Sequence, residues 1–173
     1  MSENPEEKRE KKKYTDEEKM LKFCARGTTY HVEYMLNKNP SLISTKDSDD
    51  YSPLHRACSN DNVEVVKLLV EKGADVHART VDGWTPLHSA CKWGALESAS
   101  VLVNSGANVN AKFNGDVTPL HLAASTRIRG LVELLLHHPD IDINVVNKAR
   151  DTPLDVARRS SPYYRLFEQI KYL

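Results

Sequence analysis

The chain has 173 residues, enough for one domain, and its 24 lysines and arginines balance its 24 aspartates and glutamates. This balance gives no general attraction to nucleic acid or to an anionic membrane surface. No stretch has the length of a transmembrane helix, and no secretory signal begins the chain. We therefore expect no membrane partner and a cytoplasmic or nuclear location.

The first 14 residues are almost all charged or polar, and we predict a disordered, solvated tail over 1–14. The basic run from Lys8 to Lys13 is interrupted by Glu10. An alternative interpretation of this run is a weak nuclear-import signal. Thr15 and Glu18 then have the spacing of a capping box, which predicts that the first ordered helix starts here.

A hexapeptide recurs along the rest of the chain. It reads SPLHRA at 52–57, TPLHSA at 85–90 and TPLHLA at 118–123, with a steady spacing of 33 residues. A changed copy, TPLDVA, follows 34 residues later at 152–157. The serine or threonine can cap a helix, and the proline suits the first helical position because it has no N–H to satisfy. Each copy therefore predicts the start of a short helix.

The residues after each copy predict the rest of one structural unit. After TPLHSA, Gly94 ends the first helix and a second amphipathic helix follows over 95–104. Residues 108–111 lead into an extended arm, and Asn114-Gly115 is a strong signal for a tight hairpin turn. One unit is thus helix, turn, helix and hairpin arm.

This period and the T-P-L-H-x-A core resemble the ankyrin repeat family, from about Leu21 to the end of the chain. The resemblance implies an all-α solenoid of about five repeats, including N- and C-terminal caps, in one domain over 15–173. The expected repeats are about 15–47, 48–80, 81–113, 114–147 and 148–173. It also implies an intracellular protein without catalytic activity, and it suggests a regulatory role that includes gene regulation.

Some residues depart from the repeat pattern. Asp50, Asp116 and Arg150 stand where the third repeat has Gly83. Aspartate tolerates a positive φ better than most residues and arginine does not, so we expect a changed turn at Arg150. Pro139 should stop the second helix of the fourth repeat just before it.

The recurring His55, His88 and His121 are the obvious candidates for catalysis or metal binding. Because each has the same place in its repeat, we interpret them as structural groups that link adjacent repeats through both ring nitrogens. The chain contains no G-x-S-x-G, H-E-x-x-H or phosphate-binding glycine loop. We therefore expect no enzymatic activity, no cofactor and no metal.

Three cysteines lie at similar positions of three repeats: Cys24, Cys58 and Cys91. None has the paired spacing of a disulfide framework or a zinc site. We interpret them as small buried side chains in a reducing compartment.

The variable positions of the repeats predict the functional surface. In this geometry the arm tips and first helices line one concave side, where aromatic and basic side chains gather. The candidate partner-binding residues are Tyr51, Arg79, Val81, Trp84, Lys92, Trp93, Lys112, Phe113 and Val117. Because tryptophan, tyrosine and arginine often carry interface energy, we predict that this surface binds an unidentified protein. We expect the chain itself to be a monomer. Alternatively, Trp84 and Trp93 pack as structure.

A second function class is a nucleic-acid-associated nuclear factor. In that interpretation the basic tail, with Arg79, Lys92 and Lys112, holds phosphates. The neutral charge balance makes direct nucleic-acid binding the weaker expectation.

Asn144 is a candidate modification site. The resemblance implies this, because asparagine at this arm position of ankyrin repeats is a target of an oxygen-dependent asparaginyl hydroxylase, and Leu136, Asp142 and Ile143 precede it. Asn110 has the same place but lacks the acidic residue before it. The alternative is structural, with the amide hydrogen-bonding backbone groups of the arm.

Overall fold

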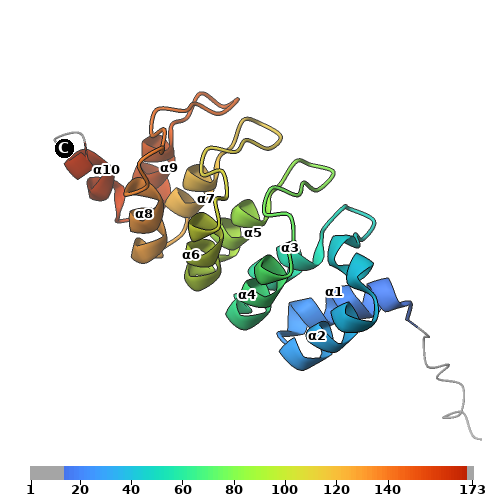
Figure 1. Ribbon diagram of the computed structural model, residues 1–173. Coiled ribbons are helices and arrows are strands. Elements are labelled where there is room, and N and C mark those ends of the chain that lie inside the picture. Colours follow the sequence, from blue (N-terminus) through green and yellow to red (C-terminus); the bar gives the residue numbers. More distant parts are fainter. Residues whose placement is uncertain (1–13, 171–173) are drawn as a thin grey trace, which may run out of the picture.

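The computed structural model describes residues 14–170, so all of the predicted tail except Tyr14 lies outside the described residues. Two rows of short helices run side by side along the molecule (Figure 1). The first row is α1 (Asp16–Arg26), α3 (Pro53–Cys58), α5 (Pro86–Trp93), α7 (Pro119–Ser125) and α9 (Pro153–Ser160). The second row is α2 (Thr29–Lys38), α4 (Val63–Glu71), α6 (Leu96–Asn104), α8 (Arg129–Leu136) and α10 (Tyr164–Ile170).

Each first-row helix packs on its neighbours in that row and on the second-row helix that follows it. The arms between successive helix pairs project from one side of the stack (Figure 1). A short 3-10 helix, η2 (Pro40–Ser44), begins the first arm. Between residues 14 and 170, no helix is both long and apolar enough to cross a bilayer. This is an all-α solenoid, as the sequence predicts; the exact repeat boundaries stay a prediction.

The hexapeptides form the predicted helix starts. In α5, the Thr85 hydroxyl accepts the His88 backbone N–H, and the His88 ring accepts the Thr85 backbone N–H, so that both close a capping box. The same box is present at α3, α7 and α9. At the N-terminus, Thr15 and Glu18 form the predicted capping box of α1. The helix before Pro139 ends at Leu136, also as predicted.

The core is a continuous column of equivalent side chains. Leu54, Leu87 and Leu120 are at most 1% exposed. The alanine three residues after each of them, as at Ala90, is fully buried and lets neighbouring helices approach closely. Each repeat therefore depends on its neighbours for burial, so that stability is shared along the stack.

Polar side chains in the second repeat tie it to both neighbours. The Asp61 carboxylate accepts the Ser98 backbone N–H at 2.9 Å and its hydroxyl at 2.7 Å, which caps the first turn of α6. The Asn62 amide donates to the carbonyl oxygens of Cys24 and Ala25 at the end of α1, at 2.8 and 2.9 Å. Asp61 stands in place of a glycine and keeps the positive φ, at 52°.

One backbone hydrogen bond joins each arm to the next, in addition to side-chain contacts. Each bond runs from an N–H of one arm to a carbonyl of the arm before it: Val81 to Asp49 (3.0 Å), Asn114 to Asp82 (3.1 Å) and Lys148 to Gly115 (2.8 Å). Within the described residues, the strand-type pairing is an isolated bridge between Phe113 and Val117.

The prediction of a changed turn at Arg150 was wrong. Arg150 has φ 64°, close to the 86° of Gly83, and its N–H donates to Asn147 as the Gly83 N–H donates to Thr80. The neighbouring arm explains this, because the bond from Lys148 to Gly115 holds the turn in place. The Arg150 side chain is exposed, so the left-handed backbone meets no further crowding.

Candidate functional site

Trp93 stands at the C-terminal end of α5 with 66% of its surface exposed. Beside it is an open hollow of about 290 Å³, which spans the gap between α3 and α5. The residues that line it are Tyr51, Arg56, Ser59, Asn60 and Trp93, and we call it the Trp93 hollow. Two residues predicted from separate repeats, Tyr51 and Trp93, are thus brought to one place.

A fixed cluster forms one wall of the Trp93 hollow. The Arg56 guanidinium lies 4.6 Å from the centre of the Tyr51 ring and donates from Nε and Nη2 to the Asp47 carboxylate. Burial raises the pKa of Asp47, but hydrogen bonds from Arg56 and from the Tyr51 backbone outweigh it and leave the pKa below its usual value. Asp47 is therefore ionised near neutrality, and the wall keeps its shape.

Arg56 was missed by the sequence analysis. It lies at the helix position of Ser89 and Leu122, which are buried and half-buried, so the repeat pattern marks it as an interior position. The available signal was the chemistry: an arginine at such a position must reach a carboxylate or open surface. In the structure it does both.

Trp84 has a different role from Trp93. It is half-buried, and its ring lies 4.9 Å from Phe113, which in turn meets the His88 ring edge-on at 5.1 Å. Val117 is half-buried beside them and bridges to Phe113. These contacts place Trp84 beneath the next arm, in line with the structural alternative for this residue, while Trp93 has the exposed position.

The recurring histidines link repeats as predicted, with one exception. The His55 Nδ1 accepts from Ser52, and its Nε2 donates to the Trp84 carbonyl at 3.0 Å. His121 makes the same two links, the second to the Asp151 carbonyl at 3.0 Å. At His88 the Nε2 atom is buried without a hydrogen-bond partner in the described residues.

Burial keeps these histidines neutral. It lowers the pKa of His55 and of His88 to about 4, against an ordinary value near 6.5. Burial also lowers the pKa of His121. Because Nδ1 of each ring accepts a backbone N–H, the Nε2 tautomer is the one present, and a second proton would break that bond.

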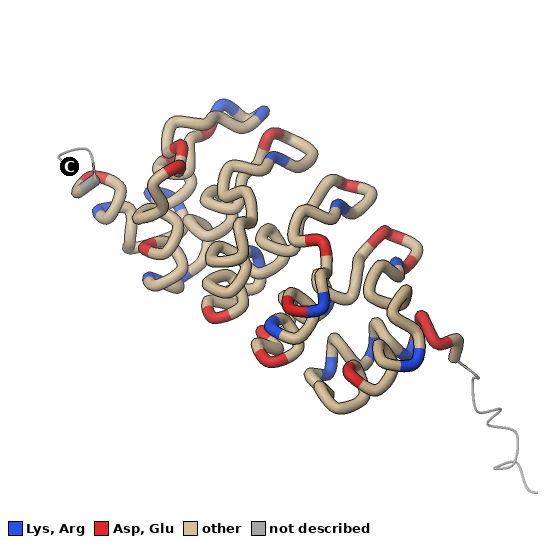
Figure 2. The backbone as a smooth tube through the Cα atoms, in the orientation of Figure 1, with Lys and Arg blue, Asp and Glu red and all other residues tan. Residues whose placement is uncertain are grey.

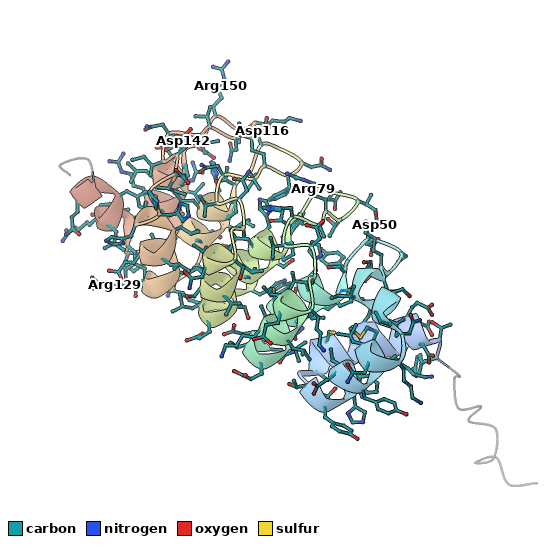
Figure 3. All side chains as sticks on the ribbon, viewed as in Figure 1. Asp50, Arg79, Asp116, Arg129, Asp142 and Arg150 are labelled. Atoms are coloured by element: carbon teal, nitrogen blue, oxygen red, sulfur yellow. The ribbon has the colours of Figure 1, made fainter. Side chains whose placement is uncertain are left out.

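Of the remaining predicted residues, Lys92 is exposed near the end of α5 and the other three lie on the arms. The Arg79 guanidinium donates to the Gly83 and Lys112 carbonyls, both at 2.8 Å, so it joins two arms. Val81 is 69% exposed, and Lys112 is exposed. The arms carry charges of both signs (Figure 2), and Figure 3 shows Asp50, Arg79 and Asp116 along their outer edge. Arg79, Val81 and Lys112 thus lie on the arms and do not line the Trp93 hollow.

The two candidate asparagines differ in their contacts. The Asn110 amide donates to the Asp140 carbonyl at 2.6 Å and accepts the Asp142 N–H at 2.9 Å, so it holds the next arm. Asn144 is exposed, and within the described residues its side-chain amide makes no such link. Asn144 is therefore the more accessible of the two, and its hydroxylation stays a prediction.

Cys24, Cys58 and Cys91 are buried free thiols. Burial raises the pKa of Cys24 to about 12 and raises those of Cys58 and Cys91 as well, so none is a reactive thiolate. In residues 14–170, no group of three or more histidine, cysteine or carboxylate side chains is placed to hold a metal ion.

The stacked helix pairs, capped by S/T-P-L-H and joined by arms, define a repeat protein. A family model described as "Ankyrin repeats (3 copies)" matches residues 4–80, 21–113 and 77–147, and the chain belongs to the ankyrin repeat family. Ankyrin repeats are protein–protein interaction modules, and the family is generally non-catalytic.

Among individual proteins, the chain is similar to Ankyrin repeat domain-containing protein 49. It is 55% identical to that protein from Bos taurus over 166 residues, which cover 94% of this chain and 69% of the relative. It is 54% identical to the Homo sapiens protein over the same shares. For the Mus musculus protein the identity is 51%, over 92% of this chain and 68% of the relative.

Proposed function

We propose that this protein is an adaptor or regulator that binds a protein partner over its first-row helices, with the Trp93 hollow at the centre of the contact. The observation that carries the proposal is the 66% exposure of Trp93 beside a hollow of about 290 Å³. Large apolar side chains that stay exposed next to a pre-formed hollow are typical of interface anchors. Such a partner would bury Trp93 together with Tyr51.

The partner-binding surface extends beyond the hollow in this proposal. Lys92 lies next to Trp93, and Val81 and Lys112 are exposed on the neighbouring arms. Trp84, Phe113 and Arg79 support the surface from beneath, since they hold the arms together. In the same proposal, the protein acts in the cytoplasm or nucleus, and its role includes gene regulation.

The nucleic-acid alternative has less support. Arg79 donates two hydrogen bonds to backbone carbonyls, and the arms carry charges of both signs (Figure 2). A phosphate backbone needs a continuous row of free cations.

The test is capture of partners by the full chain and by two variants. Trp93→Ala removes the anchor, and Tyr30→Ala removes an aromatic side chain on α2 that is even more exposed, at 74%. Proteins that Trp93→Ala loses and Tyr30→Ala keeps are partners of the hollow. For a partner identified in this way, calorimetry should show that Trp93→Ala weakens binding by about 2 kcal/mol, roughly 30-fold.

Equal capture by wild type and Trp93→Ala would contradict the proposal. Circular dichroism of both variants checks that each retains its helices, so that any loss of binding reflects the surface and not the fold.

A further inference from the structure

The last turns of the first-row helices carry charge of a single sign. Their charged side chains, apart from histidine, are Arg26, Arg56, Lys92, Arg158 and Arg159, and within these turns there is no carboxylate. Arginine or lysine at a helix C-terminus complements the helix dipole, which accounts for some of this pattern. The helix dipole does not explain why some of these cations form ion pairs with carboxylates and others do not.

Three of these cations are already neutralised. Arg56 pairs with Asp47, Arg158 with Glu168, and Arg159 with Asp151. Arg26 and Lys92 are exposed, and neither has an ion pair with a carboxylate in the described part of the chain. The two residues occupy the same helix position two repeats apart, with Ser59 at the repeat between them.

The Trp93 hollow lies between these two free cations, because Ser59 lines it. A second hollow, of about 390 Å³, continues from Arg56 toward α1 and is lined by Leu21, Lys22 and Ala25 among others. The carboxylates nearby are engaged: Asp47 with Arg56, and Glu18 with the backbone N–H of Thr15. A partner crossing from α1 to α5 therefore meets a mainly apolar recess and then the Trp93 hollow, where the aromatic rings of Tyr51 and Trp93 stand beside polar groups, with Arg26 and Lys92 exposed at the two ends.

We propose that the partner binds through an acidic segment, which places one large apolar side chain in the Trp93 hollow and carboxylates near Arg26 and Lys92. This inference rests on the proposed function and adds the chemistry of the partner. Neighbouring packed helices lie about 8–10 Å apart, so the two cations are about 16–20 Å apart. An extended segment rises about 3.3 Å per residue and spans this with about five or six residues.

The same features favour a polypeptide over nucleic acid. Arg26 and Lys92, about 16–20 Å apart, do not follow a duplex that carries one charge per about 1.7 Å, even together with Lys22, whose ammonium lies over the Tyr14 ring. The hollow of about 290 Å³ has room for one side chain. Complementary charge at its edges would speed association and make binding salt-dependent.

The test uses fluorescence anisotropy with the full chain and two labelled synthetic peptides. In the first, a single phenylalanine lies between glutamates five or six residues apart; in the second, each glutamate is replaced by glutamine. We expect the acidic peptide to bind about tenfold more tightly at about 50 mM salt, and the difference to shrink at about 500 mM. An oligothymidylate of similar length serves as the nucleic-acid probe.

Charge reversal then locates the contact. Lys92→Glu and Arg26→Glu should each weaken the acidic peptide severalfold, whereas Lys72→Glu, the same change at an exposed lysine after α4, should not. Equal binding of the two peptides, no binding of the acidic peptide, tighter binding of the oligothymidylate, or an equal loss with Lys72→Glu would overturn the inference. If Trp93→Ala still abolishes partner capture while the charge reversals do not matter, the proposed function stands and this inference alone fails.

Discussion

The two tryptophans show how one residue type takes two roles in this stack. Trp84 packs on Phe113 under an arm, whereas Trp93 projects from the end of α5. Trp84→Ala should lower the free energy of unfolding by about 2 kcal/mol, because it leaves a half-buried gap against Phe113. Trp93→Ala should change it by less than about 0.5 kcal/mol. Urea denaturation of both variants measures this, and equal losses would mean that Trp93 is also a packing residue.

The buried histidines make a prediction about pH. In the folded chain the pKa of His55 and of His88 is about 4, below the value near 6.5 expected after unfolding. The unfolded chain therefore binds more protons between these values, so stability is full above pH 6.5 and falls as the pH drops toward 4. The loss can reach about 3 kcal/mol for each histidine.

Urea midpoints measured at about pH 7 and about pH 5 check the histidine prediction. A stability that stays constant over this interval would contradict the neutral, buried state of the rings.

At the scale of single elements, the arm turns hold the main backbone strain. Arg150 has φ 64°, a conformation that costs a residue with a side chain about 1 kcal/mol. Arg150→Gly should therefore stabilise the fold by about 0.5–1 kcal/mol. Ala149→Gly, one residue earlier, has no positive φ to relieve and should not stabilise. Thermal unfolding compares the two, and destabilisation by Arg150→Gly would show that the side chain matters more than the backbone.

The elements also show what the sequence could and could not predict. The helix starts followed from S/T-P-L-H, because capping and the missing proline N–H act locally. The turn at Arg150 did not follow, since a hydrogen bond from the neighbouring arm imposes its shape on a residue with the wrong preference. Nor did the Trp93 hollow, whose walls come from α3 and α5 and depend on Arg56 turning toward Asp47. Contacts between repeats determine both the turn at Arg150 and the shape of the Trp93 hollow, and the repeat pattern of the sequence does not predict such contacts.

At the scale of the whole molecule, stability should pass from repeat to repeat. Leu87 is fully buried in α5, with first-row helices packed on both sides. Leu87→Ala should cost about 2–5 kcal/mol and make unfolding less cooperative, since it weakens the interfaces on which both halves of the stack depend. The exposed Val81, on the arm before α5, offers a control, because Val81→Ala should leave the denaturation midpoint unchanged. An unchanged midpoint for Leu87→Ala would refute this account of the core.

The most direct test of the binding surface places a photo-crosslinking amino acid at Ser59, inside the Trp93 hollow, in the full chain expressed in cells. The same amino acid at Arg129, on α8 and away from the arms (Figure 3), is the comparison. We predict that irradiation joins a defined protein to the chain from position 59 and not from position 129. A protein joined only from position 129, or none from position 59, would contradict the central claim that this face of the first-row helices binds the partner.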